Sequence, residues 1–358
     1  MSCQGAPTPA FTLSSGAPES TGAQSTTGST GGSTSLSSST TEADSAAASS
    51  SSTGGGVTAT APVSDVGWDS STGDIVPKGC QGKIDLVFLI SQGAWMITAQ
   101  KQLIEAFPGF IETIESRFED FDFHIMVVDS HSGWGRDHCT MACPDLSCKV
   151  GEPCCLYTQP KGSVCCEVPD YPCVTIDFVT QCDQTGGAGS VFPSGMFAKN
   201  APCKVAGGRR YLTKDDPDLE GTFACVAQVG TVAINNLAEN LVASLQPEIN
   251  GPGGCNEGFL RDDALLMVTI IEPGNNDDSP GSPEEWADAV IAAKNGDPNA
   301  VVVLQIGNPA CPDGDAVCQF TKLFPNHMRG DLEDSDFTGQ FAEASTLVED
   351  ACEQLIPQ

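Results

Sequence analysis

The chain has 358 residues and a formal net charge of −31. This excess of acidic side chains argues against nucleic acid or an anionic lipid surface as the main partner, because phosphate contacts need Lys and Arg. The longest largely apolar run, residues 264–271, is far shorter than the roughly 20 residues of a membrane-spanning helix.

Residues 1–79 differ in composition from the rest of the chain. They are dominated by Ser, Thr, Gly and Ala, as in residues 24–33 and 46–56. Such a segment buries too little apolar surface to offset its chain entropy, so we expect a disordered tether with an end-to-end span of roughly 50 Å. Residues 80–358 are long enough to bury a core and are expected to form one folded domain.

Apolar runs and helical periodicity alternate within the expected domain. Strands are predicted at residues 83–90, 121–128, 264–271 and 300–306. Helices are predicted at residues 96–118, kinked or restarted at Pro108, at 223–245, broken near Gly230, and at 283–293 and 341–355. This alternation predicts an α/β fold with a mostly parallel sheet.

Residues 130–220 interrupt the alternation and are rich in Cys, Gly and Pro. We expect an irregular insert, held by disulfides, at one edge of the sheet. Residues 174–179 are a candidate for an added edge strand.

The cysteine count indicates disulfides and an oxidising compartment. There are 17 cysteines, and an even set remains when Cys3 is set aside. The pairing cannot be deduced from the spacing. The candidate disulfide residues are Cys80, Cys139, Cys143, Cys148, Cys154, Cys155, Cys165, Cys166, Cys173, Cys182, Cys203, Cys225, Cys255, Cys311, Cys318 and Cys352.

Cys3 stands directly before the tether, and no signal peptide is visible ahead of it. If translation starts upstream, the residues before Cys3 would complete a segment like a bacterial lipoprotein cleavage box. We therefore expect lipidation of Cys3, with an incidental terminal thiol as the alternative. Several acyl chains on that residue would anchor the protein firmly.

Three stretches, Asp85–Met96, Gly221–Thr231 and Phe259–Ile271, together carry a family resemblance. They resemble von Willebrand factor type A domains, in particular a cysteine-rich branch on secreted or lipid-anchored bacterial surface proteins. The resemblance covers about residues 80–356. It implies a doubly wound, Rossmann-like sheet with a divalent cation held by three loops.

The residues at that implied cation site depart from the family pattern. The first loop of the family reads Asp-x-Ser-x-Ser, whereas the matching positions here are Ser91, Gly93 and Trp95. Thr231 matches the Thr of the second loop, and Glu272 follows the strand where the family places Asp. Because Mg²⁺ binding depends on carboxylate oxygens, we expect no metal and no cofactor there, with Glu272 as the main route to a weak cation site.

Two other groups of residues are candidates for a metal. His131 and His138, with Cys139 and Cys143, have the residue types of a zinc site, although disulfides explain these cysteines better. The acidic loop at residues 275–279, with Asp277 and Asp278, could bind Ca²⁺, and a solvated turn is the simpler interpretation.

The function that these observations favour is a non-enzymatic, envelope-tethered, extracytoplasmic binding or adhesion module. We expect the loops that carry Ser91, Trp95, Thr231 and Glu272, together with the insert, to contact a protein or polysaccharide at the cell surface. Trp95 and Trp134 are candidate exposed anchors, with burial in the core as the alternative. A metal-dependent hydrolase and a purely structural envelope component are the alternative functions.

Overall fold

A six-stranded, mostly parallel sheet forms the centre of the fold, with strand order β3-β2-β1-β4-β5-β6. The computed structural model describes residues 82–93, 95–117, 122–131, 133–135, 179–232, 235–274, 278–312 and 314–354. The strands are β1 (Lys83–Ile90), β2 (Asp122–Asp129), β3 (Leu212–Thr213), β4 (Leu265–Ile271), β5 (Val301–Gly307) and β6 (Asn326–Asp331). Only β3, at one edge, pairs antiparallel with its neighbour.

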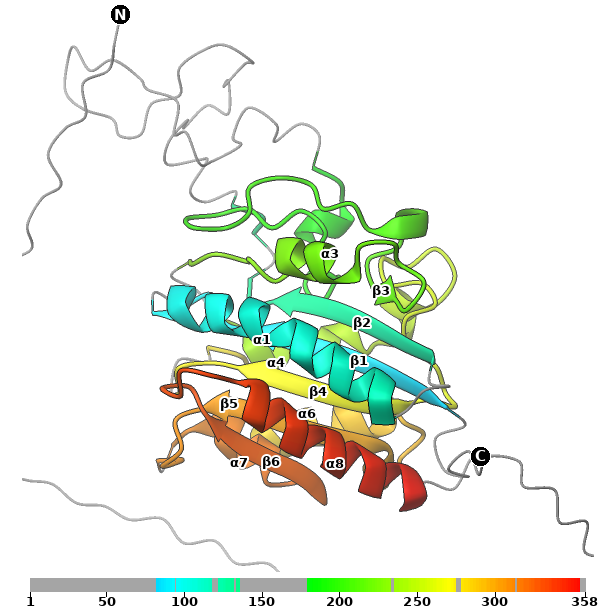
Figure 1. The fold of residues 1–358 in the computed structure, drawn as a ribbon, viewed down its shortest axis with the longest axis vertical. Helices are drawn as coiled ribbons and strands as arrows, with labels where there is room; N and C mark the ends of the chain where they lie inside the picture. Colours follow the sequence, from blue (N-terminus) through cyan, green and yellow to red (C-terminus); the bar gives the residue numbers. More distant parts are fainter. Residues whose placement is uncertain are drawn as a thin grey trace, which may run out of the picture. The chain divides into compact units, whose positions relative to one another are not determined.

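Helices cover both faces of this sheet (Figure 1). Helices α1 (Met96–Arg117), α3 (Leu219–Val226) and α8 (Thr338–Gln354) pack on one face. Helices α4 (Leu237–Ser244), α6 (Pro283–Ala292) and α7 (Ala316–Thr321) pack on the other. The short elements are α5 (Pro247–Asn250), η2 (Cys182–Gln184), η3 (Ala206–Gly208) and η4 (Pro298–Ala300).

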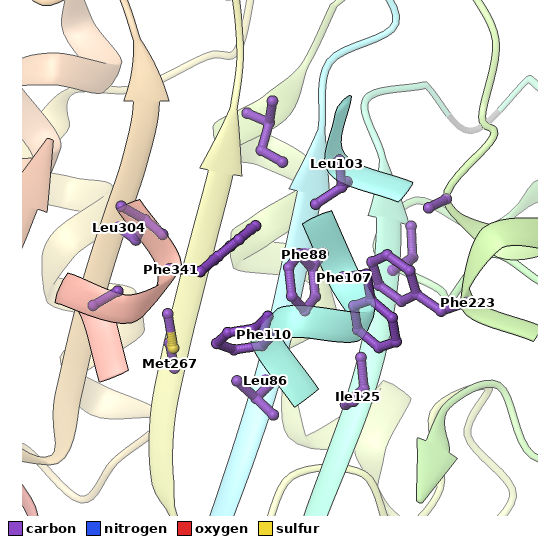
Figure 2. Close-up of a cluster of buried hydrophobic side chains, with 14 of the residues drawn as sticks. Leu86, Phe88, Leu103, Phe107, Phe110, Ile125, Phe223, Met267, Leu304 and Phe341 are labelled. Carbon is purple, nitrogen blue, oxygen red and sulfur yellow. The ribbon is translucent and has the colours of Figure 1, made fainter. Parts of the chain in front are cut away.

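Burial of the central strands on both faces explains their unbroken apolar runs. Every residue of β4 and β5 is buried, as in a parallel sheet covered by helices. On the α1 face, Phe88 of β1 lies edge-on to the rings of Phe107, Phe110, Phe223 and Phe341, with centroids 5.0–6.2 Å apart (Figure 2). Residues far apart in the sequence therefore meet in one aromatic cluster.

The four predicted strands are present, with bounds within one residue of those expected. The predicted break near Gly230 is also present, because α3 ends at Val226 and α4 begins at Leu237. Gly230 has a φ of 75°, and a Cβ there would lie 2.6 Å from backbone atoms of Met196 and Ala198. Glycine is therefore required at this turn.

Of the two alternatives predicted at Pro108, a kink or a restarted helix, the restart is wrong, because α1 is a single helix of 22 residues. Proline removes one backbone hydrogen bond from a helix interior. On either side of it, Phe107 and Phe110 are buried in the aromatic cluster, and this packing holds the helix together.

The sequence analysis missed β6, α7 and β3. The strand β6 is an edge strand with only Asn326 and Gly330 buried, so it has no apolar run to detect. Its pairing with β5, from Asn326–Val302 to Asp331–Gly307, defines it instead. The edge strand beside β2 is β3; of the candidate range 174–179, only Val179 is described, and it is not in a strand.

Disulfides connect parts of the domain that are distant in sequence. Described pairs are Cys182–Cys255, Cys203–Cys225 and Cys311–Cys318. Cys352 is also disulfide-bonded. The other candidate cysteines, Cys3 and the whole of the predicted tether lie outside the described residues. The described part of the insert, residues 179–220, has little regular structure: η2, η3, β3 and the start of α3.

A buried ion pair joins β1 and β2 near their amino ends, at the opposite end of the strands from the loops that follow β1 and β4. Asp85, fully buried in β1, accepts hydrogen bonds from the Arg261 backbone nitrogen (2.7 Å) and Nε (2.8 Å). The same guanidinium donates to the Asp122 carboxylate (2.6 Å) and to the Ile84 carbonyl (3.0 Å). Arg261 thus links β1, β2 and the segment before β4.

We predict that Arg261→Ala lowers the free energy of unfolding by about 3–5 kcal/mol, because it leaves Asp85 buried without its partner. Urea unfolding measures this as a lower midpoint at unchanged m-value. Lys83→Ala is the control: it removes a pair with Asp263 in which both side chains are about a third exposed, and should cost less than about 1 kcal/mol. Equal losses for the two variants would contradict the assignment.

Candidate functional site at the carboxyl ends of the strands

The strand register brings the loops after β1 and β4 together. Ile90 pairs with Ile271, so Ser91 and Glu272 follow at the same height on adjacent strands. The Ser91 backbone nitrogen donates to the Ile271 carbonyl at 2.9 Å, which continues the pairing by one step. From β1 the chain continues to β2 on one side, and from β4 it continues to β5 on the other side. The strand order therefore reverses between β1 and β4. Open α/β sheets bind ligands at such a point, outside the carboxyl ends of the strands.

Ser91 is fully buried, and its hydroxyl is held by internal hydrogen bonds. It donates to Asn235 Oδ1 at 3.1 Å and accepts from the Gly93 backbone nitrogen at 3.1 Å. The hydroxyl therefore stabilises the turn after β1.

Glu272 is also fully buried, and both of its carboxylate oxygens accept hydrogen bonds. Oε1 accepts from Gln305 Nε2 at 2.8 Å, and Oε2 accepts from the Gly274 backbone nitrogen at 2.8 Å. Gln305 Oε1 in turn accepts from Arg329 Nε at 3.1 Å. These hydrogen bonds connect the carboxylate to β5, to β6 and to its own loop, so the carboxylate stabilises the arrangement of these segments.

Thr231 lies in the loop between α3 and α4, and two glutamines attach this loop to the segment at the end of β1 and to α1. The Gln92 side-chain nitrogen Nε2 donates to the Val229 carbonyl at 2.8 Å, and the backbone carbonyl of Gln92 accepts from the Val232 backbone nitrogen at 2.7 Å. Gln100 of α1 binds both the nitrogen (3.1 Å) and the carbonyl (2.9 Å) of Gly230. The loops carrying Ser91, Thr231 and Glu272 thus converge, as the sequence predicted.

Thr231 itself is bound to the insert rather than left open toward the other two loops. Its backbone nitrogen donates to the Met196 carbonyl at 2.8 Å, and its hydroxyl approaches the same oxygen at 3.4 Å. Met196 and Thr231 form an isolated antiparallel bridge. A segment of the insert therefore lies directly beside the predicted site.

Trp95 and Trp134 have opposite environments. Trp95, just before α1, is 84% exposed, so its ring points into solvent. Trp134 is only 6% exposed and packs edge-on against Phe192 at a centroid distance of 4.8 Å. The prediction of an exposed anchor therefore holds for Trp95 and is wrong for Trp134.

Trp95 is not the only exposed apolar side chain at this end of the domain. Met196 is 46% exposed and Phe197 is 54% exposed, and both belong to the insert segment that pairs with Thr231. Trp95 follows the loop in which Gln92 binds Val229 and Val232, so all three exposed side chains belong to segments attached to the loop at residues 229–232. We call Trp95, Met196 and Phe197 the apolar patch; of the exposed large apolar residues in the described ranges, only Leu323 lies elsewhere.

A polar pocket lies next to this site, at the end of β2. Asp129 closes β2 in register with Ile90, and its carboxyl accepts from the His131 backbone nitrogen at 3.3 Å. Burial raises the pKa of the Asp129 carboxyl to about 7, although the His131 hydrogen bond and the charge of Arg210 lower it. Arg210 is already paired with Asp183 at 2.7 Å. The pocket's lining residues include Gln92, Asp129, His131, Trp134, Asp183, Ser194 and Arg210.

No cluster of three or more His, Cys, Asp or Glu side chains suited to a metal occurs in the described ranges. His131 lines the polar pocket, while His138, Cys139, Cys143 and Asp277 lie outside the described residues, so the zinc and calcium alternatives stay predictions. Asp278 is described, and its backbone nitrogen donates to the Asn235 carbonyl at 2.7 Å. No described helix is long and apolar enough to cross a membrane.

No family model and no curated protein matches the chain. Among solved structures, a match is proximal thread matrix protein 1 (PTMP1) from the mussel byssus, at 13% identity and a TM-score of 0.31, over 77% of this chain and 47% of that chain. A second crystal form of the same protein aligns at 12% identity with the same TM-score, over 77% and 46%. The chain spans about half the length of these structures, and the likeness is too weak to assign a family.

Sequence reasoning did not identify Gln92, Gln100, Asn235 or Asp129 as parts of this region. Gln100 did carry a signal, since a polar residue on the apolar stripe of a predicted helix needs a buried partner. Asp129 also did, because it ends a buried parallel strand. Gln92 and Asn235 carried none, because their partners come from distant loops.

The raised pKa of Asp129 gives a prediction for stability against pH. The folded protein holds this proton more tightly than the unfolded chain, so ionisation costs stability as the pH rises from 3.8 to about 7. Asp129→Asn should therefore unfold like the wild type near pH 4 and be more stable at pH 8, by on the order of 1–3 kcal/mol because the residue keeps some contact with water. Thermal melts at several pH values measure this difference.

Asp183→Asn is the matched control, with the opposite sign. Burial raises the pKa of Asp183, but hydrogen bonds from Thr180 and the charge of Arg210 outweigh it and lower the pKa overall. The stability from ionised Asp183 is therefore present above pH 3.8 and lost as the pH falls, so this variant should be less stable than the wild type at pH 8. A stabilising effect of both substitutions, or of neither, would contradict the two assignments.

Proposed function

We propose that this protein is a non-enzymatic, extracytoplasmic binding or adhesion module built on a degenerate von Willebrand factor type A domain. The observation that carries the proposal is the apolar patch of Trp95, Met196 and Phe197 beside loops whose polar groups are engaged internally. Exposed aromatic side chains at the carboxyl ends of the strands are suited to a partner's surface, because Trp is a favoured anchor at interfaces.

The strand order supports a doubly wound domain of this type. The order β3-β2-β1-β4-β5-β6 has its reversal between β1 and β4, and helices lie on both faces. The three loops that hold a cation in the family meet here, but Ser91 replaces a carboxylate and both carboxylate oxygens of Glu272 accept internal hydrogen bonds. We propose that recognition here proceeds without a metal.

The disulfides support an extracytoplasmic location, since such bonds persist in oxidising compartments. In this proposal residues 1–79 tether the domain to a bacterial envelope, through a lipid on Cys3, and present the apolar patch to a protein or polysaccharide. No described group of residues favours the hydrolase alternative.

We predict that the purified chain gives no heat of binding with Mg²⁺ or Mn²⁺ at the convergent loops in calorimetry. The reason is that the Ser91 hydroxyl and the Glu272 carboxylate are already held by Asn235, Gln305 and Gly274. Tight binding of either ion that Thr231→Ala or Glu272→Ala abolishes would overturn the metal-independent mechanism.

We predict that the chain binds cell-envelope preparations of its host equally well in EDTA and in Mg²⁺, and that Trp95→Ala weakens binding at least tenfold. The expected loss follows from the large contact area of an exposed Trp at an interface. Leu323→Ala, which removes an exposed apolar side chain outside the patch, is the control and should leave binding unchanged. Equal effects of the two substitutions would indicate that the patch is not the binding surface.

A further inference from the structure

The polar pocket at the end of β2 contains an unusual set of unpaired groups. Buried side-chain nitrogen and oxygen atoms nearly always have hydrogen-bond partners in folded proteins. Three residues that line this pocket break the rule: Gln92 through Oε1, Trp134 through Nε1 and Ser194 through Oγ have no partner among the described residues. Their exposed fractions are only 3%, 6% and 5%.

Other contacts hold these side chains in place around the pocket. Gln92 is fixed by its Nε2 hydrogen bond to the Val229 carbonyl (2.8 Å), which leaves Oε1 free to accept. Trp134 is fixed by Phe192, and the chain reaches it through a strained backbone with a φ of 42°. The pocket is therefore built and rigid before any ligand enters.

The charges around the pocket exclude an anion as its ligand. The guanidinium of Arg210, which lines the pocket, already donates hydrogen bonds to Asp183 Oδ1 (2.7 Å) and to the Gly189 carbonyl (2.7 Å). Asp129 adds an acidic group to the pocket, and its ionised form would repel a negative charge. The unpaired indole N–H of Trp134 also argues against a bare cation, because an N–H donor needs an acceptor and a metal ion offers none.

The hydrogen-bonding inventory fits a ligand group that both donates and accepts. Asp129 and Gln92 Oε1 are acceptors, Trp134 Nε1 is a donor, and the Ser194 hydroxyl can do either. A hydroxyl group has this dual character. The cavity volume of about 20 Å³ is enough for one or two groups of the size of water, which needs roughly 10–15 Å³. A sugar ring would not fit inside, but the hydroxyls at its edge would.

We propose that this pocket binds the vicinal hydroxyl or hydroxymethyl groups of a neutral sugar or related polyol, with the ring outside. The hydroxyls donate to Asp129 and Gln92 and accept from Trp134 and Ser194, in place of the waters that such a pocket holds. The pocket is separate from the apolar patch, so it does not depend on the proposed function.

The test uses the full chain labelled with ¹⁵N, in which the Trp134 indole N–H resonance reports directly on the pocket. The probes are a panel of neutral mono- and disaccharides, CaCl₂ and MgCl₂, and an N-acetyl amino-acid amide. We expect a downfield shift of the Trp134 indole with at least one sugar, at a Kd of about millimolar because few ligand atoms are buried. A shift with the metal salts or the amide but not with any sugar overturns the proposal, as does no shift with any probe.

Variants separate this binding from other effects. Asp129→Asn should weaken sugar binding about tenfold and Ser194→Ala a few-fold, with thermal melts to show that both fold. Thr269→Val is the matched control: it removes a buried unpaired hydroxyl on β4 that does not line the pocket, and should leave the Kd unchanged. Trp95→Ala should also leave the Kd for the sugar unchanged. A negative result for the apolar patch can therefore be told apart from a negative result for the pocket. Sugar binding that survives both Asp129→Asn and Ser194→Ala would overturn the proposal.

Discussion

The guanidinium of Arg261 holds the two halves of the sheet together at the amino ends of the central strands. It binds Asp85 in β1 and Asp122 in β2, and its own backbone leads into β4. Burial raises the pKa of Asp85 to about 6 against the charges of Arg261 and Lys294, so the pair is ionised at neutral pH. Because β1 and β4 are fixed at their amino ends, the loops at their carboxyl ends converge in a defined register.

That fixed register gives the carboxyl ends of the strands two different surfaces. Beside β1 and β4, the polar groups of Ser91 and Glu272 stabilise the loops themselves, and Trp95 faces solvent. Beside β2, the insert covers the strand end and encloses Asp129 with unpaired polar atoms. The first surface is apolar and open, the second is polar and narrow, and together they are consistent with recognition of a partner that carries both kinds of group.

The sequence predicted the central strands well for a physical reason. The strands β1, β2, β4 and β5 are buried on both faces, so almost every residue in them must be apolar and the run is visible directly. The edge strands β3 and β6 have no such constraint. The strand β6 exists because β5 offers it unpaired backbone groups, and the helix α1 continues through Pro108 because the phenylalanines around it pack on Phe88.

The sequence by itself determined which residues stand at the ends of the central strands, Ser91 after β1 and Glu272 after β4 among them. Tertiary structure alone decided where the side chains point. Trp95 is exposed and Trp134 is buried although both follow strand ends, and the Glu272 carboxylate is bound by Gln305 from a different strand. Residue type sets which hydrogen bonds and contacts are possible, but the partner is chosen by the register of strands that lie far apart in the chain.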